Sequence, residues 1–208
     1  PLGGIAVSLE RVDSYIDGTS VPPSSGQYAE KIDPRTNEAF KHVALSDQVD
    51  VDNAIASAAR AQKTWASMRP PTRGRILTDV GRAIREHGKR LGDIESTETG
   101  KPGREMPALI DFVAEFFEYF GGACNVVDGE LIDQGPDYHV YTQRHPFGVV
   151  GVILPWNAPL HQAARAVAPA LAAGNAVVAK PSDETPGSLA EVAGIAVDAG
   201  LPPGPPNV

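Results

Sequence analysis

Two short apolar runs near the end of the chain, each followed by a helical pattern, constrain the fold more than any other feature of the sequence. Residues 148–154 and 175–179 have the length and the continuous apolar character of strands that are buried on both faces. Helical patterns cover residues 159–173 and 186–199, and residues 207–208 read as the first step of a third strand. This β-α-β-α-β order predicts right-handed crossovers and a parallel sheet, and therefore an α/β fold.

The longer part of the chain before this sheet is predicted to be mainly helical. Helical periodicity begins at Asp47 and recurs up to residue 120, with interruptions at Pro70-Pro71 and Gly100. Gly121 and Gly122 are expected to end the last of these helices, because glycine commonly follows a helix C-terminus.

Strand-like patterns also occur outside the predicted sheet. Residues 15–18 and 39–43 are short pieces of this kind in a region rich in Gly, Pro, Ser and Asp. Residues 130–132 and 138–144 read as the two strands of a hairpin, joined by a turn at residues 133–137.

The composition argues against several classes of protein. The formal net charge is -8 and no cluster of Lys and Arg provides the basic face that a nucleic-acid-binding protein needs. No apolar run is long enough to span a bilayer. Pro1-Leu2-Gly3-Gly4 lacks the basic region of a signal peptide. Cys124 is the one cysteine, so no internal disulfide can form, and we expect a reducing, cytoplasmic location.

Polar residues follow both predicted strands, at the edge of a parallel sheet where ligands bind. Asn157 follows the first strand, and its side chain suits either a helix cap or a hydrogen-bond donor to a ligand. Lys180 and Asp183 follow the second strand, and could equally form a surface ion pair of little energetic value. Thr185 is expected to cap the helix that begins at Pro186.

Several spaced motifs in register resemble the N-terminal portion of the aldehyde dehydrogenase superfamily. They lie at residues 98–102, 146–157, 168–175, 180–186 and 200–204. The resemblance implies three regions. Residues 1–128 would form the N-terminal helical part of a cofactor-binding domain, residues 129–147 a hairpin extension, and residues 148–208 the first half of a Rossmann-like core.

The resemblance also implies a reaction, the NAD(P)-dependent oxidation of an aldehyde to a carboxylate. A Cys thiolate attacks the aldehyde, and a water activated by Glu hydrolyses the resulting thioester. In this family the Asn at the position of Asn157 donates its amide to the developing oxyanion. The nucleophilic Cys and the Glu are expected beyond Val208, so these 208 residues alone are expected to be inactive.

The cofactor residues implied by the resemblance flank the same strand ends. Lys180, Ser182 and Asp183 would bind the adenosine ribose, and an acidic residue there favours NAD, with NADP possible. Asp183 stands where Glu is usual in the family, and its side chain is shorter by one methylene group. The nicotinamide side would be lined by Ile153, Leu154, Pro155 and Trp156, although core packing is an equal alternative for Ile153. The missing Gly-x-Gly-x-x-Gly motif is neutral, because this family binds NAD without it.

The hairpin at residues 130–145 resembles the oligomerisation hairpin of the family, which implies a homodimer or homotetramer. Two alternatives to aldehyde oxidation remain. One is an acylating or semialdehyde-specific relative, and the other is a binding or structural protein without activity.

Cys124 is expected to be a small buried apolar residue, not the nucleophile. His145 stands where the family often has Glu. His161 is expected to be a surface or core residue, with a position facing the substrate tunnel as the alternative, and no pair of histidines has metal-ligand spacing.

Overall fold

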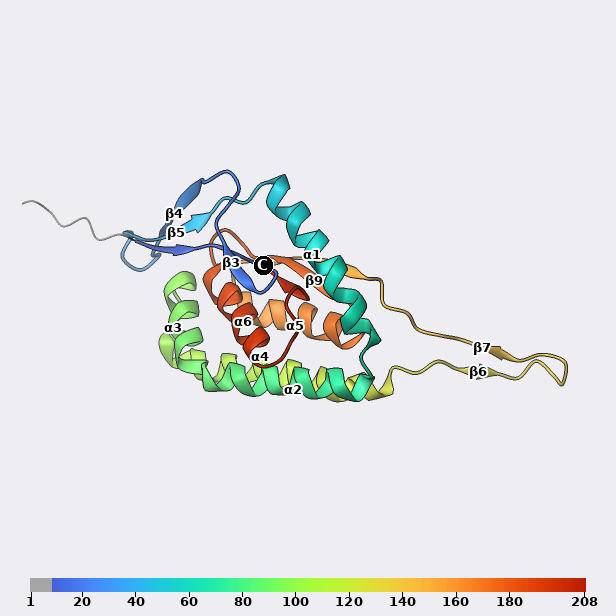
Figure 1. The fold of residues 1–208 in the computed structure, drawn as a ribbon. Coiled ribbons are helices and arrows are strands. Elements are labelled where there is room, and N and C mark those ends of the chain that lie inside the picture. Colours follow the sequence, from blue (N-terminus) through green and yellow to red (C-terminus); the bar gives the residue numbers. More distant parts are fainter. Residues whose placement is uncertain (1–8) are drawn as a thin grey trace, which may run out of the picture.

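The computed structural model describes residues 9–208, so the opening Pro1-Leu2-Gly3-Gly4 lies outside the described residues. Figure 1 shows an α/β body from which one long hairpin projects. Among residues 9–208, no helix combines the length and the apolar character that crossing a membrane requires.

The predicted parallel sheet is present, with the predicted element order. It contains β8 (Val149–Ile153), β9 (Ala176–Lys180) and β10 (Pro206–Asn207), in the spatial order β10-β9-β8. The crossovers are α5 (Pro159–Ala172) and α6 (Gly187–Asp198). Both strand pairs are parallel, as the β-α-β-α-β order predicts.

Within residues 9–208, residues 148–154 are not buried on both faces, contrary to the prediction. β8 is at the edge of the sheet among these residues, because β9 alone pairs with it there. Gly151 is exposed, and Ile153 is 85% exposed. β9 has a strand on each side and is largely buried, with Val177 at 1% exposure, so only this central strand has the burial that its apolar character indicates.

Four helices precede the sheet. They are α1 (Gln48–Ser67), α2 (Pro70–Glu86), α3 (Gly88–Thr99) and α4 (Met106–Ala123), with short 3-10 turns at Gly103–Glu105 and Cys124–Val126. Asp47 forms a capping box with Asp50 at the start of α1, which explains the early onset of helical periodicity. The side chains buried between these helices and the sheet form one apolar cluster.

α4 does not end at Gly121 and Gly122 but continues through them. A Cβ atom on Gly121 would lie 2.7 Å from the carbonyl oxygen of Gly74 in α2, and Gly81 of α2 makes a similar approach to Ala114. Gly121 therefore serves close packing of two helix backbones, and the interpretation of this pair as a helix stop was wrong.

The N-terminal region holds more strand than its helical patterns suggest. β1 (Glu10–Val12), β5 (Ala39–Ala44) and β4 (Tyr28–Ile32) form one sheet, and β2 (Ser14–Ile16) pairs with β3 (Thr19–Val21). The backbone of Tyr15 exchanges two hydrogen bonds with Val208, of 2.7 and 2.9 Å. β2 thus lies beside the end of the chain that follows β10.

The predicted hairpin is present but its paired segments are short. β6 (Leu131–Ile132) pairs antiparallel with β7 (Val140–Tyr141), and both extend away from the body in Figure 1. Leu131 is 75% exposed and Tyr141 is 59% exposed. The hairpin therefore presents apolar side chains that no other described part of the chain covers.

Candidate functional site

Two turns lie side by side at the carboxyl edge of the parallel sheet. The β8 turn (residues 154–158) leads from β8 into α5, and the β9 turn (residues 181–186) leads from β9 into α6. The last residues of the two strands, Ile153 and Lys180, are partners in the register. The Leu154 amide donates to the Lys180 carbonyl at 3.0 Å. The predicted site residues are therefore brought to one edge, where parallel sheets bind ligands.

Asn157 lies in the β8 turn, and its side chain is exposed. The residue at the N-cap of α5 is Ala158, with no side-chain cap, so the helix-cap interpretation of Asn157 is wrong. Within residues 9–208 the Asn157 amide makes no hydrogen bond. A neutral donor is therefore available at this edge of the sheet.

Lys180, the last residue of β9, pairs with Asp183 of the β9 turn, while Glu184 of the same turn pairs with Lys31 of β4. Lys180 Nζ donates to Asp183 Oδ1 at 2.6 Å and to the Pro181 carbonyl at 3.1 Å. The Lys180 and Asp183 side chains are 63% and 80% exposed, so this ion pair is the solvated one that the sequence left open. Ser182 Oγ accepts from the Glu184 amide at 3.2 Å. A ligand would have to compete for these groups.

The four residues expected on the nicotinamide side separate into two kinds. Ile153, Pro155 and Trp156 are exposed, with Trp156 at 57%. Leu154 is 7% exposed and belongs to the apolar core. Core packing is thus the observed role of the Leu154 side chain, whereas the Ile153 side chain does not pack into the core formed by residues 9–208.

Both helices that leave this edge are capped by carboxylates of α3, which the sequence interpretation missed. Glu95 Oε1 accepts from the Leu160 amide at 3.0 Å and from Ser188 Oγ at 2.8 Å. Glu98 accepts from the Gly187 amide at 3.1 Å and from Lys41 Nζ at 3.4 Å. Burial raises the pKa of both carboxyl groups, although the hydrogen bonds that each accepts oppose this shift.

One signal could have revealed these two residues. Glu95 and Glu98 follow Leu91 at helical spacing, and all three side chains are buried. A carboxylate on the core face of a helix needs hydrogen-bond partners, so the pattern itself points to a structural or functional contact.

Thr185 does not cap α6, contrary to the expectation. α6 begins at Gly187, its N-cap residue is Pro186, and no side-chain cap comes from the turn itself. Thr185 Oγ1 is buried without a hydrogen-bond partner among the described residues. Glu98 takes the place of a local cap, since its carboxylate accepts the hydrogen bond from the Gly187 amide at the start of α6.

His161 lies one helical turn after Asn157 and contacts two aromatic rings of α4. The ring centroids of Phe112 and Phe116 are 5.3 and 5.7 Å from that of His161. Burial lowers the pKa of His161, and the charges of Arg165 and Lys101 add to this. An imidazole with a lowered pKa and two aromatic rings therefore flank the start of α5. His145, by contrast, is exposed on the segment between the hairpin and β8.

Cys124 lies at the other end of α5 from Asn157. Its thiol is 2% exposed and is 3.6 Å from the carbonyl oxygen of Ala172, the last residue of α5. A helix of 14 residues is about 20 Å long. Burial also raises the pKa of the thiol. Position and pKa both oppose a nucleophilic role at the Asn157 turn.

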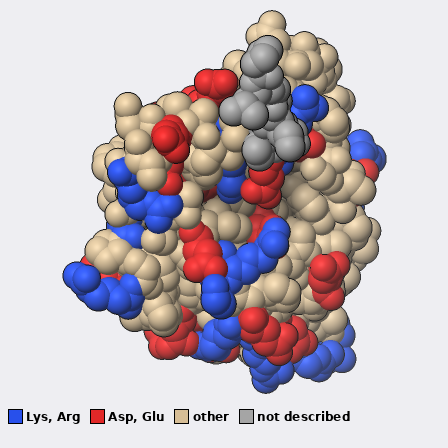
Figure 2. All heavy atoms as spheres, turned by 90° about the vertical axis from the view of Figure 1, so that its left-hand side faces the viewer, with Lys and Arg blue, Asp and Glu red and all other residues tan. Residues whose placement is uncertain are grey.

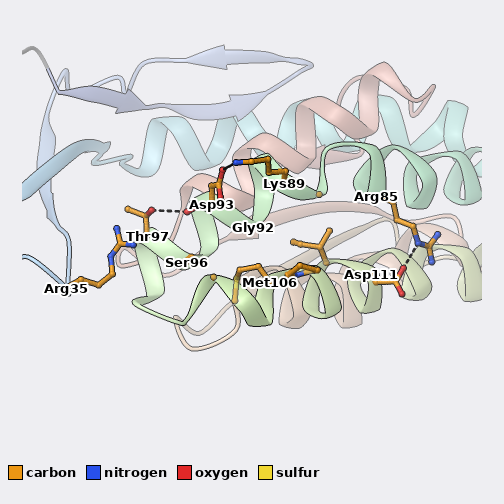
Figure 3. Close-up of a pocket in the computed structure, with 13 residues that line it drawn as sticks. Arg35, Arg85, Lys89, Gly92, Asp93, Ser96, Thr97, Met106 and Asp111 are labelled. Carbon is orange, nitrogen blue, oxygen red and sulfur yellow. Dashed lines mark hydrogen bonds and ion pairs between the residues drawn. The ribbon is translucent and has the colours of Figure 1, made fainter.

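Two other places were candidates for a site. Residues 9–208 contain no group of three His, Cys, Asp or Glu side chains that could hold a metal ion. A groove of about 590 Å³ lies between α2, α3 and α4 (Figure 3). Its cations are already neutralised, since Lys89 pairs with Asp93, Arg85 with Asp111, and Arg35 with Asp33. The groove therefore offers no unpaired charge to a ligand.

Comparison with known proteins identifies the family. The model of the aldehyde dehydrogenase family matches residues 21–208. The chain belongs to this family. Acetaldehyde dehydrogenase 2 of Cupriavidus necator is 39% identical over 200 residues, which cover 96% of this chain and 39% of that protein.

Solved structures of aldehyde dehydrogenases and related enzymes have the same fold. PnpE in complex with nicotinamide adenine dinucleotide is 36% identical, with a TM-score of 0.92, over 94% of this chain and 40% of its own. An NADP dependent enzyme of E. coli is 30% identical, with a TM-score of 0.92, over 96% of this chain and 42% of its own. The chain spans about two fifths of the length of these relatives.

Proposed function

We propose that this chain is the N-terminal portion of an NAD(P)-dependent aldehyde dehydrogenase that oxidises an aldehyde to a carboxylate. The observation that carries the proposal is the exposed Asn157 amide, without a partner in residues 9–208, in the turn that follows β8, at the same edge of the sheet where Lys180 ends the paired strand β9. Family membership supports the reaction class.

Asn157 would act on the carbonyl oxygen of the aldehyde. Attack by a thiolate turns this oxygen into an oxyanion, and a fixed N–H donor stabilises the oxyanion more than it stabilises the carbonyl. One such donor is typically worth about 3 kcal/mol. The amide is neutral, so it does not compete for the thiolate. The nucleophilic Cys and the general-base Glu are assigned to the part of the enzyme that follows residue 208.

The residues of the two turns fit a dinucleotide. Asp183 is an exposed carboxylate of the kind that accepts ribose hydroxyls, and Lys180 and Ser182 flank it. Exposed Ile153 and Trp156 offer apolar contact to a flat ring beside Asn157. When bound, the nicotinamide accepts the hydride. NAD is the preferred cofactor in this proposal, because Asp183 repels a 2'-phosphate, and NADP is the weaker alternative.

The hairpin is proposed as an oligomerisation element. Its exposed apolar residues, which include Leu131 and Tyr141, suit pairing with a second copy of the chain in a homodimer or homotetramer. We also propose three regions, residues 1–128, 129–147 and 148–208, because the hairpin projects from the body between α4 and β8.

The test is product identification with the full-length enzyme that carries this segment. Incubation with NAD and an aldehyde should give NADH and the carboxylate in equal amounts. Addition of coenzyme A or phosphate should not divert the product to an acyl-coenzyme A thioester or an acyl phosphate. NADH formation that depends on coenzyme A would replace this proposal with an acylating relative, and no NADH with any aldehyde would remove it.

A further inference from the structure

We propose that Glu95 and Glu98 of α3 are positioning residues with different main targets. Glu95 chiefly fixes the β8 turn on the aldehyde side, because its one backbone amide partner is in α5, and Glu98 fixes the β9 turn on the cofactor side. The inference rests on the proposed function, because it assigns those sides by Asn157 and by Lys180 and Asp183.

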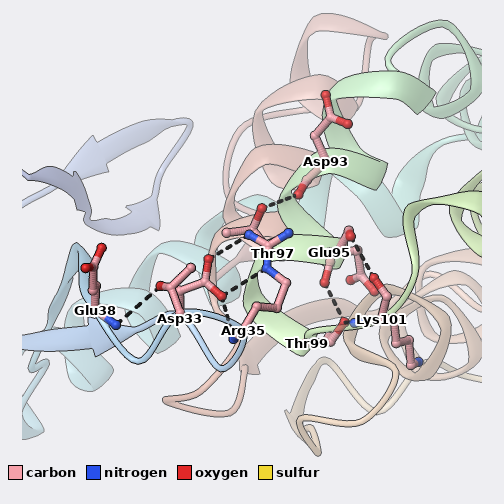
Figure 4. Close-up of polar contacts among 10 residues, drawn as sticks. Asp33, Arg35, Glu38, Asp93, Glu95, Thr97, Thr99 and Lys101 are labelled. Carbon is pink, nitrogen blue, oxygen red and sulfur yellow. Dashed lines mark hydrogen bonds and ion pairs between the residues drawn. The ribbon is translucent and has the colours of Figure 1, made fainter.

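Glu95 lies between the first turns of the two helices. Its Oε1 atom accepts from the Leu160 amide of α5 and from Ser188 Oγ of α6, at 3.0 and 2.8 Å. In Figure 4 its own backbone carbonyl accepts the Thr99 hydroxyl, at 2.6 Å. The residue is therefore held on α3 while its side chain holds the start of α5, three residues after Asn157.

The β8 turn supplies no anchor of its own. α5 has Pro159 as its first residue and Ala158 as its N-cap, and neither side chain can accept an amide hydrogen. The orphan amides of a helix start need acceptors, and Glu95 provides one from 65 residues away in the chain. Movement of this carboxylate would let the Asn157 turn move with it.

Glu95 is kept at a cost in stability. Its side chain has no exposure, and its Oε2 atom is buried without a partner among the described residues. Burying a carboxylate with one unpaired oxygen is unfavourable, and an apolar residue of similar volume often does better in such a place. Unfavourable burial of a polar group of this kind is expected mainly at functional sites. The advantage of the carboxylate is that it holds the Leu160 amide and the Ser188 hydroxyl in fixed positions.

Glu98 anchors the second turn in the same manner. It accepts from the Gly187 amide, the first residue of α6, at 3.1 and 3.2 Å to its two oxygens. Lys41 of β5 approaches the same carboxylate at 3.4 Å. Glu98 is 3% exposed, and Gly187 has no side chain in the space that Glu98 occupies. The β9 turn is thereby tied to α3 and to the N-terminal sheet.

The separate anchors predict separate effects. A misplacement of about 1 Å in a catalytic group can cost about a hundredfold in rate. Loss of the Glu95 acceptor should therefore lower kcat, since it loosens the start of α5. Loss of the Glu98 acceptor should raise the KM for NAD, since it loosens the start of α6. A general loss of stability would not change kcat and leave the KM for NAD unchanged, or the other way round.

The experiment compares four variants of the full-length enzyme. Glu95→Ala should lower kcat about tenfold or more, with the KM for NAD within about threefold. Glu98→Ala should raise the KM for NAD about tenfold or more, with kcat within about threefold. Glu95→Gln keeps the Oε1 acceptor and should stay within about threefold of the unmodified enzyme. Leu91→Ala is the matched control, since it opens a cavity on the same buried face of α3 and should leave both parameters unchanged.

Amide hydrogen exchange gives a readout that does not depend on activity. Glu95→Ala should speed exchange about tenfold over residues 157–162 and much less over 187–192, where it removes only the contact to the Ser188 hydroxyl. Glu98→Ala should speed exchange about tenfold over residues 187–192 and not over 157–162. If Glu95→Ala does not fold, Glu95→Asp takes its place, because the shorter side chain withdraws the oxygen from Leu160.

The outcomes are distinct. Equal exchange effects on both helices, an effect of Leu91→Ala as large as that of Glu95→Ala, or a loss in Glu95→Gln equal to that in Glu95→Ala would each overturn the positioning role. Absent aldehyde oxidation by the unmodified enzyme would remove the proposed function instead, while the exchange pattern would still decide whether each carboxylate fixes its own turn.

Discussion

The β8 turn leaves the Asn157 side chain without a partner in the described chain, whereas at the end of β9 the Lys180 and Asp183 side chains pair with each other. Asn157 makes no hydrogen bond within residues 9–208, but Lys180 and Asp183 lie 2.6 Å apart at their nearest atoms. Both turns lead into helices that α3 caps. The comparison indicates that the first turn can offer its donor to a ligand without breaking a contact, while the second must exchange its ion pair for ligand contacts.

The sharpest way to break this comparison is to remove the unpaired donor. In the full-length enzyme, Asn157→Ala should lower kcat about a hundredfold or more, with a much smaller change in NAD affinity, because the donor acts on the oxyanion alone. Steady-state kinetics measures both. Asn125→Ala is the control, since Asn125 is also exposed but lies at the far end of α5, next to Cys124.

A normal kcat in the Asn157→Ala enzyme would show that the turn has no oxyanion donor. Loss of thermal stability without loss of kcat would be equally damaging, because the structure gives Asn157 no capping role that such a loss could reflect.

Gly187→Ala tests the anchor of the second turn. A Cβ atom at this position would overlap Glu98 Oε1 and lie 3.0 Å from Lys41 Nζ, so the carboxylate must move. We expect a loss of about 1–3 kcal/mol in the free energy of unfolding, as for other overpacked buried sites. The KM for NAD should also rise about tenfold, because the β9 turn moves with the start of α6.

Gly122→Ala provides the matched control for that substitution. Gly122 is also inside a helix, but a Cβ atom there would meet nothing within 4 Å. Alanine is better than glycine in a helix interior by about 1 kcal/mol, so this variant should be as stable as the original or more so. A Gly187→Ala enzyme that behaves like Gly122→Ala would contradict the close contact with Glu98.

The sequence predicted the order of the sheet and its helices because those depend on local apolar patterns. Residues 175–179 and 159–173 were recognisable from a few neighbours each, and the motif at Pro155-Trp156-Asn157 placed the β8 turn at the end of its strand. The family resemblance, confirmed by the match over residues 21–208, supplied what the patterns could not.

The caps and helix contacts were not predictable in this way. Glu95 and Glu98 have partners 65 and 89 residues further along the chain, and no local pattern shows where those partners will lie. Gly121 was misinterpreted for the same reason, since the nearby backbone of Gly74 belongs to another helix. Tertiary contacts thus decided between two local roles that the same residue could have.

A smaller effect is expected at the ion pair of the β9 turn. Asp183→Asn removes the charge that would repel a 2'-phosphate, so the ratio of kcat/KM for NADP to that for NAD should rise about tenfold. Lys180 is freed from Asp183 in this variant and adds to the attraction. Asp137→Asn, in the exposed turn of the hairpin, is the charge-matched control. An unchanged ratio would mean that the Asp183 carboxylate does not reach the ribose.

The smallest effect concerns the pH dependence of stability. Burial raises the folded-state pKa of Glu95 above its unfolded value of about 4.3, so the folded state binds more protons between those two pKa values. Stability from this group therefore falls as pH rises through that window and is regained as pH falls. Glu95→Gln lacks the titration, so urea unfolding should show the original enzyme gaining stability relative to Glu95→Gln as the pH is lowered from 7 toward 4.5. Asp33→Asn should behave in the opposite sense, because hydrogen bonds from Arg35 lower the pKa of Asp33 to about 2, and its contribution is lost as pH falls from about 4 through that value. A difference between the original enzyme and Glu95→Gln that does not vary with pH would show that the Glu95 carboxyl has the same pKa in the folded and unfolded states, contrary to its burial between α5 and α6.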